Sequence, residues 1–370
     1  MKKIKKFFKS PGIFMRDYFN NRYPLFNIEQ CIEEPNEAII FEHTINMASM
    51  ESHLYTDTSG IDVVFTWVDN NDLKWREKYQ AHLSNSDTTK FALYSQDSAR
   101  FENHNELYYS LYSVENFLPW ARKIYIVTDN QTPSWFKQSE HPKVTIIDHT
   151  AIIDSQYLPT FNSHVIEAHL HNIPDLSEQF IYFNDDVFVA RVLPQEHFFH
   201  PNGIASIFIA DKKISTMLEK GVIFSTTLKA SLNSINLLKD HYNNISINKP
   251  LVHTYVPLFK SAFRKAWWLY NEQIINFLPN KFRTNADLNL ATFLIPWLMY
   301  LEGRSTPSWE ICYYFNIRSA NALTQYRKLL QKKGTKFAPH SICANDFNSK
   351  QQFHNYQNYL AIMLKEYYSL

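Results

Sequence analysis

The sequence IDVVFTWVDNNDLKWREKYQAHL, residues 61–83, joins a β-rich run to a helical pattern. Residues 61–68 are dominated by β-branched and aromatic side chains, which favour a strand. Residues 72–83 then predict a helix. A strand that leads into a helix is the repeating unit of α/β proteins, so this stretch sets the expected fold class.

Strands and helices continue to alternate after this unit. We expect strands at 123–129, 143–149 and 180–189, and helices at 105–117 and 163–171. This alternation predicts an α/β fold with a mostly parallel, Rossmann-like sheet that is flanked by helices.

Polar residues follow the predicted strands. In parallel sheets, ligands bind beyond the carboxyl ends of the strands. The residues expected there are Asp69, Asp129, Asp148, His149, Asp185 and Asp186.

The chain divides into three predicted parts. Residues 1–58 form an extension, 59–205 the α/β catalytic core, and 206–370 a helical, aromatic-rich lobe that completes the cleft. The extension begins with lysines interleaved with phenylalanines, which leaves two alternatives: contact with an anionic membrane surface, or a solvated terminus. The longest apolar run, 290–301, is too short to span a bilayer, and we find no signal peptide. We therefore expect a cytoplasmic protein, either free or peripheral on the inner membrane.

Composition excludes several classes of protein. The 37 basic and 36 acidic residues give a net charge of +1, which is unlike the basic footprint of a nucleic-acid binder. Cys31, Cys312 and Cys343 are scattered along the chain, which argues against a disulfide scaffold or a zinc cluster and fits a reducing compartment. The six glycines form neither GxGxxG nor GxxxxGK[ST]. A bound pyrophosphate would therefore need a metal ion and Arg or Lys side chains.

The stretch FIYFNDDVFV, residues 180–189, contains the most suggestive chemistry. An apolar strand delivers Asp185 and Asp186 toward the expected cleft. Adjacent strand residues point to opposite faces, so both can face the cleft only if the chain bends or bulges. We expect one carboxylate to bind a hard divalent ion and the other to support it or contact substrate. A turn or a helix cap is the alternative.

Two further groups of polar residues allow more than one interpretation. Glu167, His164 and His171 share a face of the helix predicted at 163–171, so they could bind a metal or be hydrogen-bonded core residues. Arg100 precedes the helix predicted at 105–117, and Glu106 lies in its first turn, where the helix dipole alone would favour an acid.

His253 and Arg283 are isolated polar residues in the later, aromatic part of the chain, so their positions call for an explanation. The alternatives are active-site groups and surface residues.

Together these motifs resemble the Stealth family of hexose-1-phosphate transferases, which includes bacterial capsular polysaccharide phosphotransferases and the catalytic subunit of the lysosomal-enzyme N-acetylglucosamine-1-phosphotransferase. The segments that resemble its four conserved blocks are 61–72, then 99–136 with 158–188, then 253–261 with 281–291, and finally 341–347. The family implies a nucleotide-sugar-transferase-like form of the predicted fold. One departure is that Tyr108 and Tyr112 replace arginines that are common in the family.

The resemblance also implies roles for individual residues. The catalytic residues would be His253 as the base, Arg283, Asp186 and Glu167. The substrate-binding residues would be Asp69, Arg100, Glu106, Asn162, Asn184, Asp287 and Asn345. Asp185, Asp186 and Asp346 would hold Mg²⁺ or Mn²⁺.

The activity that the resemblance implies is transfer of a hexose-1-phosphate, expected to be an N-acetylhexosamine-1-phosphate, from a UDP-sugar to a hydroxyl of a growing capsular polysaccharide. A phosphodiester forms and UMP leaves. One alternative is a metal-dependent glycosyltransferase that releases UDP, and another is a non-catalytic carbohydrate-binding protein. The expected partners are the UDP-sugar and a saccharide acceptor, with peripheral contact to the inner membrane or to capsule export machinery, and no nucleic acid.

Overall fold

The structure is a computed structural model that describes residues 60–84, 91, 101–219, 226–319, 321–346 and 354–370, with single residues among the first 40. The predicted membrane-surface contact of the extension falls on residues outside those described. Arg100 also lies outside them.

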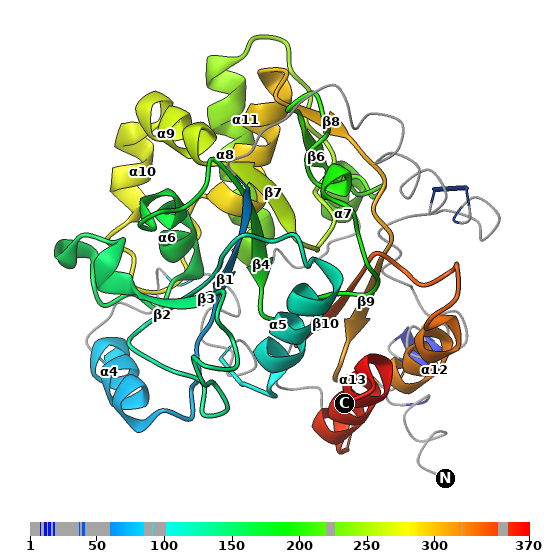
Figure 1. Cartoon of the computed structure of the whole chain (residues 1–370). Helices are drawn as coiled ribbons and strands as arrows, with labels where there is room; N and C mark the ends of the chain where they lie inside the picture. The colour runs from blue at the N-terminus through cyan, green and yellow to red at the C-terminus, as the bar shows by residue number, and fades with distance from the viewer. Residues whose placement is uncertain are drawn as a thin grey trace.

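A five-stranded sheet forms the centre of the molecule (Figure 1). Its strand order is β3-β2-β1-β4-β7, and β7 alone runs antiparallel to its neighbour. The strands are β1 (Ile61–Thr66), β2 (Ile124–Thr128), β3 (Val144–Asp148), β4 (Gln179–Asn184) and β7 (Val256–Phe259). This mostly parallel arrangement confirms the predicted fold class. Because the chain builds outward from β1 in both directions, a crevice is expected beyond the carboxyl ends of β1 and β4.

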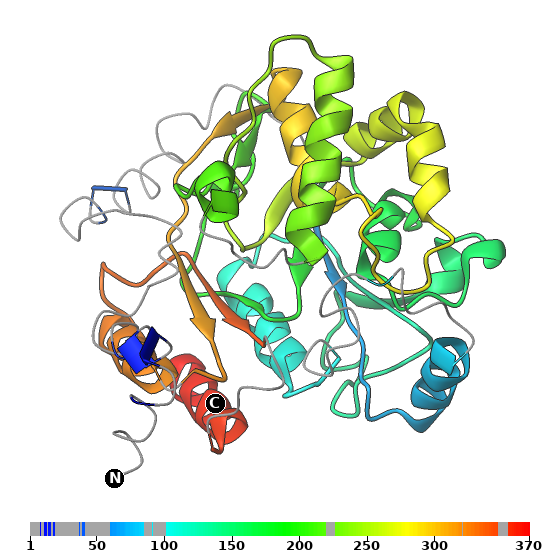
Figure 2. The same ribbon diagram turned by 180° about the vertical axis from the view of Figure 1, so that it is seen from behind.

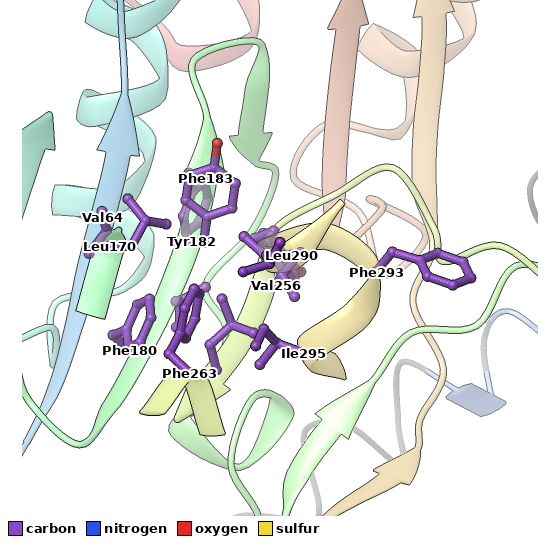
Figure 3. Close-up of a cluster of buried hydrophobic side chains, with 14 of the residues drawn as sticks. Val64, Leu170, Phe180, Tyr182, Phe183, Val256, Phe263, Leu290, Phe293 and Ile295 are labelled. Atoms are coloured by element: carbon purple, nitrogen blue, oxygen red, sulfur yellow. The ribbon is translucent and has the colours of Figure 1, made fainter. Parts of the chain in front are cut away.

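Helices cover both faces of this sheet. Helix α5 (Glu106–Phe117) stands in front of it in Figure 1, and α8 (Thr226–His241) stands in front of it in the view from behind (Figure 2). Burial on both sides explains why β1 and β2 are almost continuously apolar. Figure 3 shows part of the packed core, including Phe180 of β4 and Phe263, whose ring centres lie 5.8 Å apart.

The prediction of one continuous strand over residues 180–189 is wrong. β4 ends at Asn184, the chain turns at Asp185 and Asp186, and β5 (Val187–Val189) joins another sheet. That sheet has the order β5-β10-β9, with β10 (Ser341–Asn345) and β9 (Cys312–Asn316). This turn is the bend that allows both Asp185 and Asp186 to face the cleft.

The part from residue 206 onward contains strands as well as the predicted helices. Besides β7, β9 and β10, β6 (Ala205–Ile207) pairs with β8 (Ser305–Pro307). These strands have three to five residues, too few for alternation to distinguish them from the helical surroundings. The other helices are α4 (Leu73–Ser84), α6 (Ser163–Ala168), α7 (Ile214–Glu219), α9 (Lys260–Leu269), α10 (Asn271–Phe277), α11 (Ile295–Leu301), α12 (Ala322–Lys332) and α13 (Tyr356–Tyr368).

Within the described ranges, no helix is both long and apolar enough to cross a lipid bilayer. Cys343 is buried and Cys312 is partly buried.

Several histidines are buried in the neutral form, which makes stability depend on pH. Burial lowers the pKa of His149 to about 4 and that of His171 to about 3, from an ordinary value of 6.5. It also lowers the pKa values of His164, His169 and His340. At these histidines the unfolded chain binds more protons than the folded one below about pH 6.5, so their contribution to stability is complete above that pH and is lost as the pH falls.

We expect His171→Phe to flatten this acid dependence, because His171 stacks on Phe263 at 5.5 Å and a phenyl ring can replace it there. The slope of the unfolding free energy against pH should fall by about 1.4 kcal/mol per pH unit between about pH 5.5 and 4. Urea unfolding across this range measures the slope, and the same melts at about pH 8 isolate the packing change. An unchanged slope would show that His171 is not buried neutral.

Candidate active site

A cavity of about 810 Å³ lies beyond the carboxyl ends of the central strands. Its lining includes Thr66 and Trp67 from the end of β1, and Asn184 from the end of β4. The volume is that of a small-molecule or cofactor site. The predicted site residues that line it are Glu106, Glu167, Asn184, Asp185, Asp186, His253, Arg283, Asn345 and Asp346.

Asp186 and His253 form one corner of the cavity. Nε2 of His253 lies 3.9 Å from Oδ2 of Asp186. The same oxygen lies 3.6 Å from the Cys343 thiol and accepts a hydrogen bond from the Asn345 amide at 3.4 Å. The turn after β4 supplies Asp186, the segment before β7 supplies His253, and β10 supplies the other two. Three distant segments therefore meet at one carboxylate.

Three carboxyl groups gather at this corner. Burial raises the pKa of Glu106 to about 7, and burial together with the charges of Asp186 and Glu106 raises the pKa of Asp185 well above its ordinary value. Oδ1 of Asp186 is buried and has no hydrogen-bond partner among the described residues. Repelling carboxylates with an unused oxygen are the donor set that a hard divalent cation satisfies, so Asp185 and Asp186 fit such an ion.

Arg283 forms a second corner of the cavity. Its Nη1 donates to the hydroxyls of Thr226 and Thr227, each at 3.2 Å, and its Nη2 donates to the hydroxyl of Ser163. Nε is buried without a partner in the described part of the chain, and so is Oε2 of Glu167. Burial lowers the pKa of Arg283, whereas the charge of Glu167 raises it. Neutral hydroxyls thus orient the guanidinium and leave its charge available to an anion.

Asn162 and Asp287, predicted to contact substrate, lie beneath the cavity rather than on its surface. Both are fully buried, and the Asn162 amide donates to Oδ2 of Asp287 at 2.8 Å. Asp287 also accepts hydrogen bonds from the backbone and hydroxyl of Thr284, and His164 lies 3.2 Å from it. Because these contacts use both carboxylate oxygens, the pair holds the turn that carries Arg283.

Asp346, a predicted metal ligand, is paired with a cation instead. Both of its oxygens accept hydrogen bonds from Arg318, the one from Nη2 at 2.9 Å, and His104 lies 3.0 Å from Oδ2. The carboxylate is therefore already neutralised. Asp69, a predicted substrate contact, does not line this cavity, and its carboxylate accepts hydrogen bonds from Asn71.

The histidines of the helix predicted at 163–171 do not share a site with Glu167. Helix α6 ends at Ala168, so His171 does not continue the helical face of Glu167 and packs against Phe263 instead. His164 is hydrogen-bonded to Asp287. The interpretation as core histidines is the one that the structure supports.

The two tyrosines that replace family arginines pack against aromatic rings. Tyr108 meets Trp135 at 5.2 Å and Tyr112 meets Tyr368 at 5.9 Å. Neither lines the cavity.

A buried network beside His253 was missed by sequence reasoning. The fully buried carboxylate of Glu310 accepts hydrogen bonds from Tyr255 at 3.0 Å and from Ser341 at 2.6 Å. The Ser341 hydroxyl lies 2.7 Å from that of Thr254. The two residues after His253 are thereby tied to β10. In the sequence, Ser341 is 31 positions from Glu310 and Tyr255 is 55 positions from it. No local sequence pattern could therefore reveal this network.

Comparisons with known proteins identify the family of this chain. Family models match residues 60–87 as Stealth protein conserved region 1 and residues 100–207 as conserved region 2. A protein of Neisseria meningitidis named capsular polysaccharide phosphotransferase LcbA is 60% identical over 370 residues and covers 100% of both chains. A capsular polysaccharide phosphotransferase of Actinobacillus suis is 54% identical over 368 residues, and the alignment covers 100% of this chain and 99% of the relative.

Among solved structures, the galactosyltransferase LgtC in complex with donor and acceptor sugar analogues matches with a TM-score of 0.40 and 10% identity, covering 82% of this chain and 95% of that one. The full-length relatives and the matched regions settle the family. The chain belongs to the Stealth family of phosphotransferases.

Proposed function

We propose that this enzyme transfers a hexose-1-phosphate from a UDP-sugar to a hydroxyl group of a growing capsular polysaccharide, and releases UMP. The observation that carries the proposal is that one cavity is lined by His253, Arg283 and the adjacent pair Asp185 and Asp186. A base, an acid pair and a cation are the groups that an attack at phosphorus requires. The names of the relatives support capsule polysaccharide as the product, and N-acetylhexosamine-1-phosphate is the unit that we propose.

The proposed reaction begins when an acceptor hydroxyl attacks the phosphate that bears the sugar. Nε2 of His253 takes the hydroxyl proton as the new P–O bond forms. The bond between this phosphorus and the bridging oxygen breaks, and UMP leaves with the bonding electrons. Arg283, held by Ser163 and the two threonines, stabilises the charge on the non-bridging phosphoryl oxygens.

A divalent cation, Mg²⁺ or Mn²⁺, is part of the proposal. Asp185 and Asp186 would hold it, because their carboxylates repel each other and Oδ1 of Asp186 is unused in the described structure. Such an ion neutralises charge on the pyrophosphate. Asp346 is left out of this set because Arg318 already neutralises it.

Uncharged polar side chains on the β9–α12 side of the cavity support a saccharide acceptor. They are Asn316, Ser319, Asn321 and Gln325, and Tyr314 lies beside them. Amides and hydroxyls complement sugar hydroxyls, and an aromatic ring can pack against a sugar face. We further propose that the reaction takes place at the cytoplasmic side of the inner membrane, where residues 1–58 would contact the lipid surface or the export machinery.

Mass spectrometry of an extended acceptor tests the proposed function. Purified enzyme is given a panel of UDP-sugars with short capsular oligosaccharides and Mg²⁺ or Mn²⁺. We expect the acceptor to gain a sugar phosphate from one of these donors. A gain of the sugar alone would identify a glycosyltransferase, and binding of oligosaccharide without any turnover would identify a carbohydrate-binding protein.

A further inference from the structure

Three different donor groups surround one point at the edge of the cavity. Oδ2 of Asp186 lies 3.6 Å from the Cys343 sulfur and 3.9 Å from Nε2 of His253. One ligand atom from each of the three residues lies within 4.8 Å of the other two. Cys343 is fully buried, and Asp186 has a second, buried oxygen without a hydrogen-bond partner among the described residues.

These separations approach those of a tetrahedral zinc site. Zinc binds oxygen and nitrogen at about 2.0 Å and thiolate sulfur at about 2.3 Å, so ligand atoms on a tetrahedral ion lie about 3.3–3.5 Å apart. The observed separations from Asp186 exceed these values by about 0.1 Å for the Cys343 sulfur and by about 0.6 Å for Nε2 of His253. Small side-chain movements would therefore close the site.

The chemistry of this donor set selects the metal. Mg²⁺ prefers oxygen ligands in an octahedral arrangement, whereas thiolate with imidazole and carboxylate suits Zn²⁺. The scattered cysteines argue against zinc when only their spacing is considered. The fold changes that conclusion, because it brings Cys343 to a histidine and an aspartate from segments far apart in sequence.

We propose that Asp186, His253 and Cys343 form a zinc-binding site that inhibits the enzyme when occupied. On binding, the thiol releases its proton to solvent and the thiolate, the carboxylate and Nε2 of His253 each donate an electron pair to the ion. Nε2 then cannot accept the acceptor's proton, and Asp186 no longer serves the activating cation. The inhibition rests on the proposed function, but the binding of zinc does not.

Cobalt spectroscopy tests the site without any assay of activity. Co²⁺ added to metal-free enzyme should give a near-ultraviolet thiolate-to-cobalt absorption band at one equivalent per chain, and Zn²⁺ should displace it. Cys343→Ser should abolish the band and weaken zinc binding by about tenfold or more. Cys343→Ala is a second variant, and unfolding melts verify that both are folded.

Cys312→Ser is the matched control, because the Cys312 thiol lies near the site but donates to the backbone carbonyl of His253 at 3.4 Å. This variant should keep the cobalt band. Absence of the band from the wild type, or its persistence in both Cys343 variants, would overturn the proposal.

Inhibition is then measured with Mg²⁺ present, each variant relative to its own activity without zinc. Zinc should inhibit the wild type and Cys312→Ser at concentrations at least about tenfold lower than those needed for Cys343→Ser. Equal sensitivity of all three would contradict an inhibitory role for this site. If the cobalt band forms but no sugar phosphate is transferred, the proposed function fails and the metal site stands. If transfer occurs and no band forms, the metal site fails alone.

Discussion

Arg283→Lys is expected to lower kcat/KM by about a hundredfold or more, equivalent to roughly 3 kcal/mol of transition-state stabilisation. The substitution keeps the positive charge. The lysine ammonium group, however, has only three N–H donors. It cannot donate hydrogen bonds to Ser163 and both threonines and also present paired N–H groups to the phosphoryl oxygens. The loss should therefore appear in kcat as well as in KM. Steady-state kinetics with saturating acceptor measures it.

Arg76→Lys is the matched control for this substitution. Arg76 is exposed on α4 and donates to the backbone carbonyl of Asn70, away from the cavity lining. The Arg76→Lys variant should retain wild-type kinetics. Near-wild-type activity of Arg283→Lys would show that the guanidinium makes no paired contact with the phosphate.

Asp186→Asn is expected to reduce turnover by at least about a hundredfold, or roughly 3 kcal/mol, while the protein stays folded. The change removes a charge from a group of repelling carboxylates, so unfolding melts should show no loss of stability. It also removes the anionic ligand that we assign to the divalent cation. Raising Mg²⁺ should therefore recover little activity, whereas the wild type should lose its activity in excess chelator.

Asp175→Asn is the control for Asp186→Asn. Asp175 is exposed and has a φ of 58°, a left-handed conformation that asparagine tolerates well. This variant should keep full activity. Near-wild-type turnover of Asp186→Asn, or full wild-type activity in chelator, would remove the metal from the proposed mechanism.

The parallel core could be predicted because its signals are local. Strands β1, β2 and β3 are short apolar runs that end in polar residues, and α5 buries Leu107, Leu111 and Val114 at helical spacing. The break after β4 could be anticipated only as a bend, since the partner of β5 is β10, about 150 residues away. Strand β7 was missed for the same reason, because its pairing with β4 is not visible in its four residues.

The site was predicted in outline because the family resemblance identified residues from separate segments, and nine of them line one cavity. What the sequence does not reveal is which polar groups are already satisfied. Asp346 appears equivalent to Asp186 until Arg318 is seen to pair with it. Asp287 likewise appears to be a substrate contact until its buried partners are known. Such pairings depend on tertiary contacts that no local spacing encodes.

The central claim is that the acceptor attacks phosphorus rather than the anomeric carbon of the donor. Chromatography of the released nucleotide tests it most directly, in a preparation free of phosphatases that convert UDP to UMP, with phosphorus NMR of the product as an independent check. We predict UMP and a phosphodiester in the product. Release of UDP, together with a phosphate-free glycosidic product, would contradict the claim.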